Sequence, residues 1–492
     1  MPIHVARVDG FQGHRTVGGA LVALAALLGA ATASAHDSDA GLSAAPDPDA
    51  QAPADASATQ PVAAPEPSSP APTSPRAVAP ANPNPGAPHV PRATRDAVDY
   101  VTRRYEPAGF PLIGGDSDIG FQFGAVGTLS YFANGVQPYQ WNMDVLLSAS
   151  VKQGPNGAEI AQQSYLWQID VPNLYGGILR INPEVSYNHT INYGYFGLGN
   201  ASSGAPPPPS NPNPDRYHEW IDSIAQVRSS ARVAIRGPLS ALFAVQYLYV
   251  GPGIYADSVL MRDATAAPKP GGAPLIYGTR PLSLPSIAGG FVYDSRDNEV
   301  FAHKGMLHEI GVRLEQGIPF DANVRYAEAG AILRGFVPLG GPFVAAGRLV
   351  ANFQFGNVPF YDLFQAGPFD QKEMPGGSAG VRGVPVGRYL GPIKIIGNVE
   401  LRALLMQFTV LKQKFTIGND AFFDTGRVWS DYSFHSPLDG HGVGLKYGVG
   451  GGIYVLWGQA AMLRIEAAYS PDAVSENPTL PVGIYVNDQT MF

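Results

Sequence analysis

Polar and apolar side chains alternate along most of the chain from about residue 110 onward. In residues 140–151, the polar Asn142 and Asp144 alternate with the apolar Met143 and Val145. Successive side chains of a β-strand point to opposite faces, so this pattern predicts a strand with one polar and one apolar face. The same alternation recurs, among other places, over residues 178–188, 393–405 and 463–469.

We count about fifteen such segments, beginning near Ile119, Tyr139, Ile160, Ile178, Trp220, Ala241, Leu284, Met306, Asn323, Phe343, Ile393, Gln413, Gly442, Ala460 and Val482. A shorter segment, Phe110–Gly115, is the candidate sixteenth. The connections alternate in length: short ones include Gly237–Pro238 and Leu339–Gly340, and long ones span Gly197–Arg216, Ala256–Pro281 and Gly356–Gly391. Tilted strands of about ten residues, with short turns on one side and long loops on the other, are typical of outer-membrane barrels.

The alternative is a soluble β-sandwich or several stacked β-domains. Charged residues recur on the polar faces, which the interior of a sandwich would not accept. Tyr and Phe recur at strand ends, as in the aromatic girdles of membrane barrels. The fold class we predict is therefore all-β, a 16-stranded antiparallel transmembrane β-barrel. We expect the three long loops at one end, and the C-terminal Phe492 at the other, periplasmic end.

The N-terminal region has a different character. Arg7 and Arg15 precede an apolar run that ends at Ala33-Ser34-Ala35, as in a secretory signal peptide, although an uncleaved anchor is the alternative. Residues 36–95 are rich in Pro, Ala, Ser and Asp and bury too little apolar surface to fold, which predicts a disordered linker. Residues 94–105 have the pattern of one short helix. The predicted organisation is a signal peptide (1–35), a linker (36–95) and a barrel (96–492).

The amino-acid composition limits which partners and which kinds of site the protein can have. The 492 residues include no Cys and carry a formal net charge of -8, without a basic block. Disulfides, thiolate zinc sites and lipoprotein acylation are therefore excluded, and a nucleic-acid partner is not expected. Only 15% of the residues are charged, against about a quarter in a soluble globular protein. Lipid and lipopolysaccharide of the outer membrane are the expected surroundings, and no cofactor is expected.

Three motifs follow one another in the C-terminal half. The third long loop contains Gly376-Gly377-Ser378-Ala379-Gly380-Val381-Arg382-Gly383, the next strand Gly397-Asn398-Val399-Glu400-Leu401-Arg402, and the strand after it Phe422-Phe423-Asp424-Thr425-Gly426. With Tyr195–Asn200 and Asp294–Asn298, they resemble the BamA/TamA superfamily of bacterial surface antigens. The resemblance covers about residues 110–492. Two departures are Val384, where the family has an aromatic residue, and the Pro-rich segment in the place of the family's POTRA domains.

Strand phase places Glu400 and Asp424 inside the barrel on adjacent strands. Two carboxylates so close would raise each other's pKa unless a cation lies between them. Arg382 is available on the preceding loop, and its planar guanidinium suits carboxylates. In the family this loop folds into the lumen and the matching arginine contacts these acids, so the resemblance implies a lumenal lock of the loop. Its residues are Arg382, Gly383, Glu400, Phe422, Asp424 and Gly426.

The leading functional hypothesis is assistance of insertion or transport at the Gram-negative outer membrane. Its partners would be unfolded outer-membrane client proteins or a periplasmic accessory protein. A short first strand would leave a weak seam against the last strand, and an underpaired edge is a template for another strand. The alternatives are a passive pore, favoured by a lumen that the loop leaves open, and a surface antigen or adhesin acting through its loops.

Hypotheses of an enzymatic function have weaker support in the sequence than the hypotheses above. Gly376–Gly380 matches the Gly-x-Ser-x-Gly nucleophile motif, which needs a strand–turn–helix that a glycine-rich barrel loop does not supply. His303 and His308 lack a third ligand at metal-binding spacing. Asp294 and Asp297 are better explained as turn residues than as calcium ligands. Glu400 and Asp424 are better explained as members of an ion-pair network than as an acid–base pair. We therefore expect no catalysis.

The linker hypothesis is testable by proteolysis. Protease added at the periplasmic face is expected to cleave within residues 36–95 and to leave the barrel intact, because this stretch has few apolar side chains to bury. The cleavage sites can be located by mass spectrometry. Protection of the stretch without a bound partner would indicate a folded domain instead.

Overall fold

The computed structural model of the protein describes residues 102–116, 120–154, 157–269, 271–318, 323–410, 413–457, 461–475 and 481–487. The strands are β1 (Arg104–Asp116), β2 (Gly120–Phe132), β3 (Trp141–Gly154), β4 (Gly157–Leu174), β5 (Leu179–Gly194), β6 (Glu219–Arg236), β7 (Leu239–Val250), β8 (Gly253–Ile254), β9 (Leu282–Asp294), β10 (Gly305–Gln316), β11 (Arg325–Gly340), β12 (Phe343–Gly356), β13 (Gln365–Ala366), β14 (Lys372–Glu373), β15 (Ile393–Val410), β16 (Gln413–Trp429), β17 (Lys446–Trp457), β18 (Ala461–Tyr469) and β19 (Val482–Asn487). The helical segments are α2 (Val259–Ala264) and the 3-10 turns η1 (Tyr175–Gly177), η2 (Pro214–Arg216), η3 (Phe360–Asp362), η4 (Pro437–Asp439) and η5 (Pro471–Ser475).

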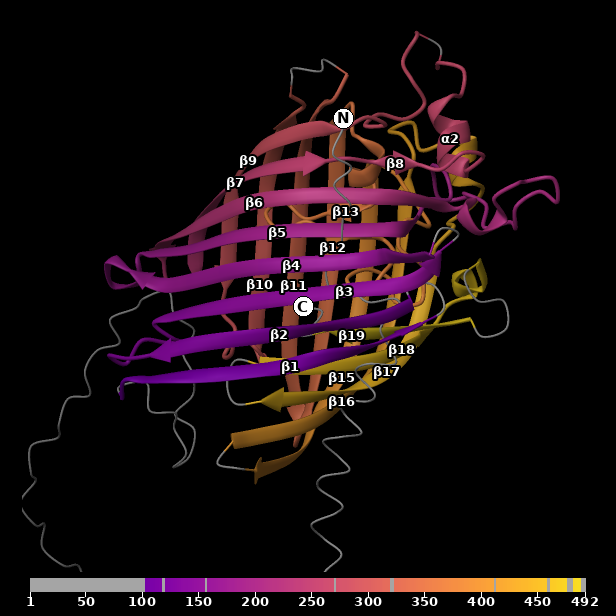
Figure 1. Ribbon diagram of the computed structural model, residues 1–492. Helices are drawn as coiled ribbons and strands as arrows, with labels where there is room; N and C mark the ends of the chain where they lie inside the picture. Colours follow the sequence, from indigo (N-terminus) through magenta and orange to yellow (C-terminus); the bar gives the residue numbers. More distant parts are fainter. Residues whose placement is uncertain are drawn as a thin grey trace, which may run out of the picture. The chain divides into compact units, whose positions relative to one another are not determined.

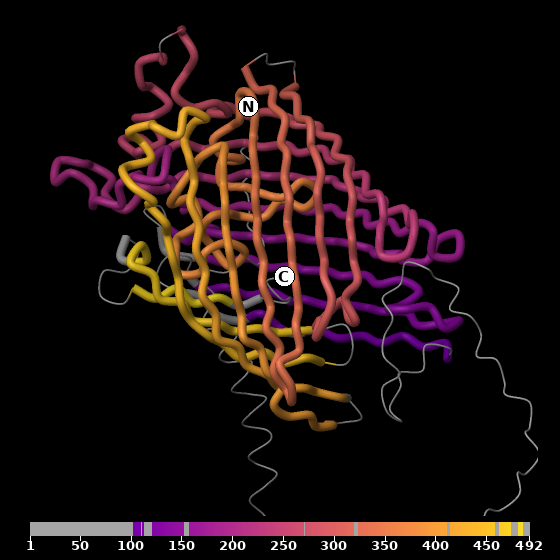
Figure 2. The backbone as a smooth tube through the Cα atoms, turned by 180° about the vertical axis from the view of Figure 1, so that it is seen from behind, coloured from indigo at the N-terminus to yellow at the C-terminus, as the bar shows by residue number. Residues whose placement is uncertain are grey.

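The long strands form one antiparallel meander. The main sheet has seventeen strands, and without the two-residue β8 sixteen remain. Each pairs with the next in sequence from β1 to β19, with β7 pairing β9 and β12 pairing β15. In Figure 1, β2–β9 form the nearer wall, and β10–β12 run behind them at a steep angle. Figure 2 shows the wall formed by β10–β12 from its own side. The strands of opposite walls cross in this view because barrel strands are tilted relative to the barrel axis. The predicted sixteen-stranded barrel is confirmed.

The two faces of each strand meet different surroundings. In β7, Phe243, Val245 and Tyr247 are exposed on the outer face, whereas Ala244 and Leu248 are buried on the inner face. Outside, apolar side chains suit lipid; inside, charged side chains must find partners. The strand phase read from the sequence therefore decides which residues can meet in the lumen.

The three long loops lie at one end of the barrel. They follow β5, β7 and β12, which run in the same direction through the meander. Backbone bridges join them: Leu198 pairs with Leu390, and Tyr277 with Pro359. We call this the loop end and the opposite end the turn end. In outer-membrane barrels the long loops are extracellular and the short turns periplasmic.

Two expectations about the N-terminal part of the barrel were wrong. The first strand is not short, because β1 has thirteen residues, all paired with β2. The helix predicted over residues 94–105 is contradicted at its end, where Arg104 and Tyr105 belong to this strand, while residues 94–101 lie outside the described residues. The signal peptide and the linker lie outside the described residues. Among the described residues, no helix has both the length and the apolar character needed to cross a membrane.

Candidate functional site

The segment between β12 and β15, residues 357–392, is the long loop of the candidate site. Its base carries η3, whose Phe360 and Tyr361 are buried in an apolar cluster at the loop end of the barrel. The ring of Phe360 packs edge-on against Trp220 of β6, with centroids 4.7 Å apart. Asp362 accepts a hydrogen bond from the Tyr326 hydroxyl of β11. The base of the loop is therefore fixed to the barrel by apolar packing and a buried polar contact.

The middle of the loop reaches the wall formed by β5 and β6. Arg228 Nη1 of β6 lies 3.1 Å from Asp370 Oδ1, and Lys372 Nζ lies 3.0 Å from the other carboxylate oxygen. Partial desolvation acts to raise the pKa of Asp370, whose side chain is 50% exposed, but these two cations outweigh it and lower that pKa to about 2. Tyr193 of β5 donates a hydrogen bond to Glu373. The loop thus extends from β12 to the β5–β6 wall.

The tip of the loop carries Arg382, whose side chain is fully buried among three carboxylates. Its Nη1 lies 2.7 Å from Glu400 Oε1 and 2.6 Å from Glu466 Oε1. Its Nε and Nη2 donate to the two oxygens of Asp424 at 2.7 and 2.9 Å, a bidentate pairing. The backbone N–H of Arg382 also donates to Asp424, at 3.1 Å. We call Arg382 with these three acids the tip network.

Strand register explains why the acids converge. Glu400 lies on β15, Asp424 on β16 and Glu466 on β18, each on the inner face. Asn398 of β15 stands opposite Asp424 and donates to its Oδ1 at 2.8 Å. The same amide donates to the carbonyl of Gly380, also at 2.8 Å. The inner face of these strands is therefore matched to both the side chain and the backbone of the tip.

Glycines provide the space for the tip. On β17, Gly448, Gly450 and Gly452 alternate along the inner face. A Cβ on Gly448 would stand only 1.8 Å from the carbonyl oxygen of Arg382. In the loop, Gly383 has a φ of +92°, a conformation that favours glycine, and its N–H donates to Tyr485 Oη at 2.5 Å. The tip therefore also contacts β19, the last strand of the meander.

The remaining predicted residues also lie around the tip. The guanidinium of Arg382 stacks over the Phe422 ring, 3.4 Å from its centroid. Gly426 faces the tip: a Cβ there would come within 3.1 Å of Val381. Val384, which stands where the family has an aromatic residue, is fully buried in an apolar cluster with Tyr389. The structure thus brings all six predicted residues together at the loop tip.

Four contributors to this site were not predicted from the sequence: Glu466, Arg402, Arg464 and Tyr485. Arg402 binds Glu400 at 2.7 Å, and Arg464 lies 3.3 Å from Glu466. Three arginines therefore balance the three acids of the tip network, as a buried charge cluster requires. The alternation over 463–469 already places Arg464 and Glu466 on one face. What it does not reveal is that β18 curves close enough to the tip for contact.

The alternative chemistries find little support in the described residues. Ser378 is buried in the loop, and no strand–turn–helix surrounds it. No group of three or more His, Asp or Glu side chains among them is arranged to hold a metal ion. Asp297 accepts hydrogen bonds from the backbone N–H groups of His303 and Lys304, so it shapes a turn.

Comparison with solved structures gives partial matches, each with a TM-score below 0.5. BamA from Haemophilus ducreyi lacking POTRA domains 1–3 aligns at 14% identity and a TM-score of 0.43, over 78% of this chain and 68% of that one. CdiB from Escherichia coli aligns at 13% identity and a TM-score of 0.45, over 78% and 61%. CdiB from Acinetobacter baumannii aligns at 12% identity and a TM-score of 0.42, over 78% and 59%. This chain thus spans about three fifths of each CdiB chain.

No curated protein sequence matches the chain. The Omp85 superfamily domain, however, matches residues 221–477, more than half of the chain. The match runs from β6 to η5 and includes the long loop and the three acids of the tip network. The resemblance to BamA and TamA drawn from the motifs is confirmed. The protein therefore belongs to the Omp85 superfamily and is a β-barrel of the Gram-negative outer membrane.

Proposed function

We propose that this barrel assists the insertion or passage of client polypeptides at the outer membrane, and that the long loop closes it at rest. The observation that carries the proposal is the docking of Arg382 inside the barrel, with a fully buried side chain bound to Glu400, Asp424 and Glu466. A passive pore needs a free lumen. Here the loop tip lies inside the barrel, so we expect traffic to require a change in the loop.

The contact between the loop tip and β19 supports a link to client handling. Gly383 binds the hydroxyl of Tyr485, and Phe422, Ala468 and Tyr485 form one buried cluster beneath the tip. β1 and β19 are the two ends of the described order of pairings. An end strand can pair with an added strand of another chain. Undocking the tip would therefore loosen the strand at which a client can be received.

Reconstitution tests this function directly. Liposomes containing the full chain are expected to fold an unfolded outer-membrane barrel client several times faster than empty liposomes. Folding is measured by the heat-resistant band on a gel. No acceleration by the full chain would contradict client assistance.

Planar-bilayer conductance distinguishes the passive pore. The full chain is expected to be mostly closed, and a variant lacking residues 356–391 to conduct more than the full chain. Steady conductance of the full chain, equal to that of the deletion variant, would instead favour a pore.

Removal of the tip cation tests the network. Arg382→Ala leaves buried acids unpaired, and breaking a buried ion pair typically costs about 3–5 kcal/mol. All four side chains are at most 1% exposed, so solvent screening reduces this cost little. The expected result is a lower temperature of band-shift on a gel and noisier conductance, with the barrel still folded.

Asp424→Asn should act in the same direction, and the double variant should be little worse than either single one, because both remove the same interaction. Arg325→Ala, which removes an exposed arginine from β11, is the matched control and should behave like the unaltered chain. Simple addition of the two single effects would mean that Arg382 and Asp424 do not act together.

A glycine substitution tests the fit of the tip without changing a charge. Gly448→Ala places a Cβ 1.8 Å from the carbonyl oxygen of Arg382, so the tip must move. The expected result is the conductance phenotype of Arg382→Ala with little loss of strand pairing, measured by circular dichroism. Gly347→Ala is the control, since its Cβ would meet nothing nearer than 3.9 Å. Equal behaviour of the two variants would argue against close docking.

A further inference from the structure

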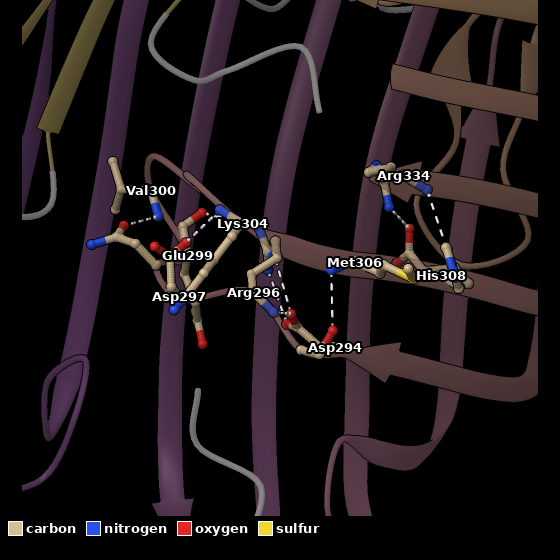
Figure 3. A network of polar contacts seen from close by, with 12 residues as sticks. Asp294, Arg296, Asp297, Glu299, Val300, Lys304, Met306, His308 and Arg334 are labelled. Carbon is tan, nitrogen blue, oxygen red and sulfur yellow. Dashed lines mark hydrogen bonds and ion pairs between the residues drawn. The ribbon is translucent and has the colours of Figure 1, made fainter. Parts of the chain in front are cut away.

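A second segment enters the barrel from the turn end. It is the connection between β9 and β10, residues 295–304, which we call the inner turn. Figure 3 shows its polar contacts around Asp294, Arg296 and Asp297. Arg296 binds both oxygens of Asp294 at 3.0 Å, and Asp297 accepts two backbone N–H groups at 2.9 and 3.1 Å. Asn298 accepts two more, from Val300 and Phe301. The inner turn therefore has a defined shape held by its own side chains.

One side of the inner turn binds the wall at β5. Glu299 pairs with Arg180 Nη1 at 3.0 Å. Arg180 is held in turn by Asp170 of β4 at 2.6 Å, and Asp170 accepts a hydrogen bond from Tyr139 at 2.7 Å. Glu299 thus belongs to a chain of polar contacts that includes β5, β4 and the turn before β3. It is not paired with a single mobile side chain.

The other side of the inner turn packs on the opposite part of the barrel. Phe301 is 4% exposed and clusters with Tyr454 of β17 and Met462 of β18. The adjacent Ala302 is also 4% exposed and packs against Phe336 of β11 and neighbouring side chains of β12. From its origin between β9 and β10, the inner turn therefore touches strands on both sides of the lumen.

A segment anchored on β5, on β11–β12 and on β17–β18 must cross the lumen. We propose that the inner turn is a second plug, which closes the turn end of the barrel while the long loop closes the interior from the loop end. The proposal does not depend on what the barrel transports, because both segments obstruct any solute.

The two plugs share a contact. The guanidinium of Arg402 lies 5.9 Å from the ring centroid of Phe301, within the range of a cation–π interaction. The same guanidinium binds Glu400 at 2.7 Å, and Glu400 binds Arg382 at 2.7 Å. Arg402 therefore connects the inner turn to the tip network through Glu400. Release of one plug changes the surroundings of the other.

Conductance of four proteins tests the second plug: the unaltered chain, Arg382→Ala, the pair Glu299→Gln with Phe301→Ala, and all three substitutions together. Two obstructions in series predict that the paired substitutions raise conductance more when Arg382 is also replaced. We expect the triple variant to conduct at least about twofold more than Arg382→Ala. A factor of about two corresponds to the weakest coupling that is usual between contacting groups. Equal conductance of these two variants would overturn the proposal.

The matched control pair is Glu106→Gln with Phe291→Ala. It removes a carboxylate from the Arg104–Glu106 pair and a phenyl ring from the outer face of β9. It should leave conductance unchanged in both backgrounds. If the control pair raised conductance as much as the inner-turn pair, any loss of a carboxylate and a phenyl ring would loosen the barrel. That result would also overturn the proposal of a second plug.

Thiol labelling provides a readout that does not depend on current. The chain has no Cys, so a single introduced cysteine is labelled uniquely. Ala302→Cys is expected to react slowly with a maleimide, and Lys304→Cys, at an exposed position of the same turn, to react fast. Equal rates would contradict a buried plug. Adding Arg382→Ala should speed the labelling of Ala302→Cys; an unchanged rate would contradict the link through Arg402.

Discussion

The arrangement of the lumen depends on one guanidinium that three carboxylates share. Arg382 contacts Glu400, Asp424 and Glu466 together, and these buried acids would repel one another more strongly without it, although Arg402 and Arg464 also pair with Glu400 and Glu466. Its position fixes where the loop tip must lie. It also explains why β17 carries glycines there, since side chains on β17 would occupy the place of the loop backbone.

The sequence was most informative where period-two alternation combined with a motif. It predicted the strand number, the end at which the loops lie and the inner faces of β15 and β16, because one residue of slippage would turn a charged face toward lipid. It did not identify Glu466 or Tyr485 as partners of the tip. Alternation assigns a face to each residue but not the curvature that brings β18 and β19 next to the loop.

The first strand shows a different limit of prediction from the sequence. β1 contains Pro107 and Pro111 together with several glycines, a composition that lowers β-propensity, and its alternation is therefore weak. Proline is tolerated at the edge of a sheet, where one side of the strand needs no ladder hydrogen bonds. The thirteen paired residues of β1 thus show that pairing with β2 outweighs local propensity. Composition misled about the length of this strand but not about its place at one end of the meander.

The attachments of the long loop differ in kind, and this difference decides how it can move. The base is held mainly by the packing of Phe360 and Tyr361 into an apolar cluster, with one buried hydrogen bond from Tyr326 to Asp362. The tip is held by ion pairs, each of which depends on the presence of its partner, in addition to the apolar packing of Val384. A change that removes or competes for the tip cation therefore frees the tip while the base stays docked. The loop would then turn about its base rather than leave the barrel, and the same event would release Gly383 from Tyr485 of β19 and alter the contact of Arg402 with Phe301. A single undocking at the centre of the lumen can in this way reach both the end strand and the turn end.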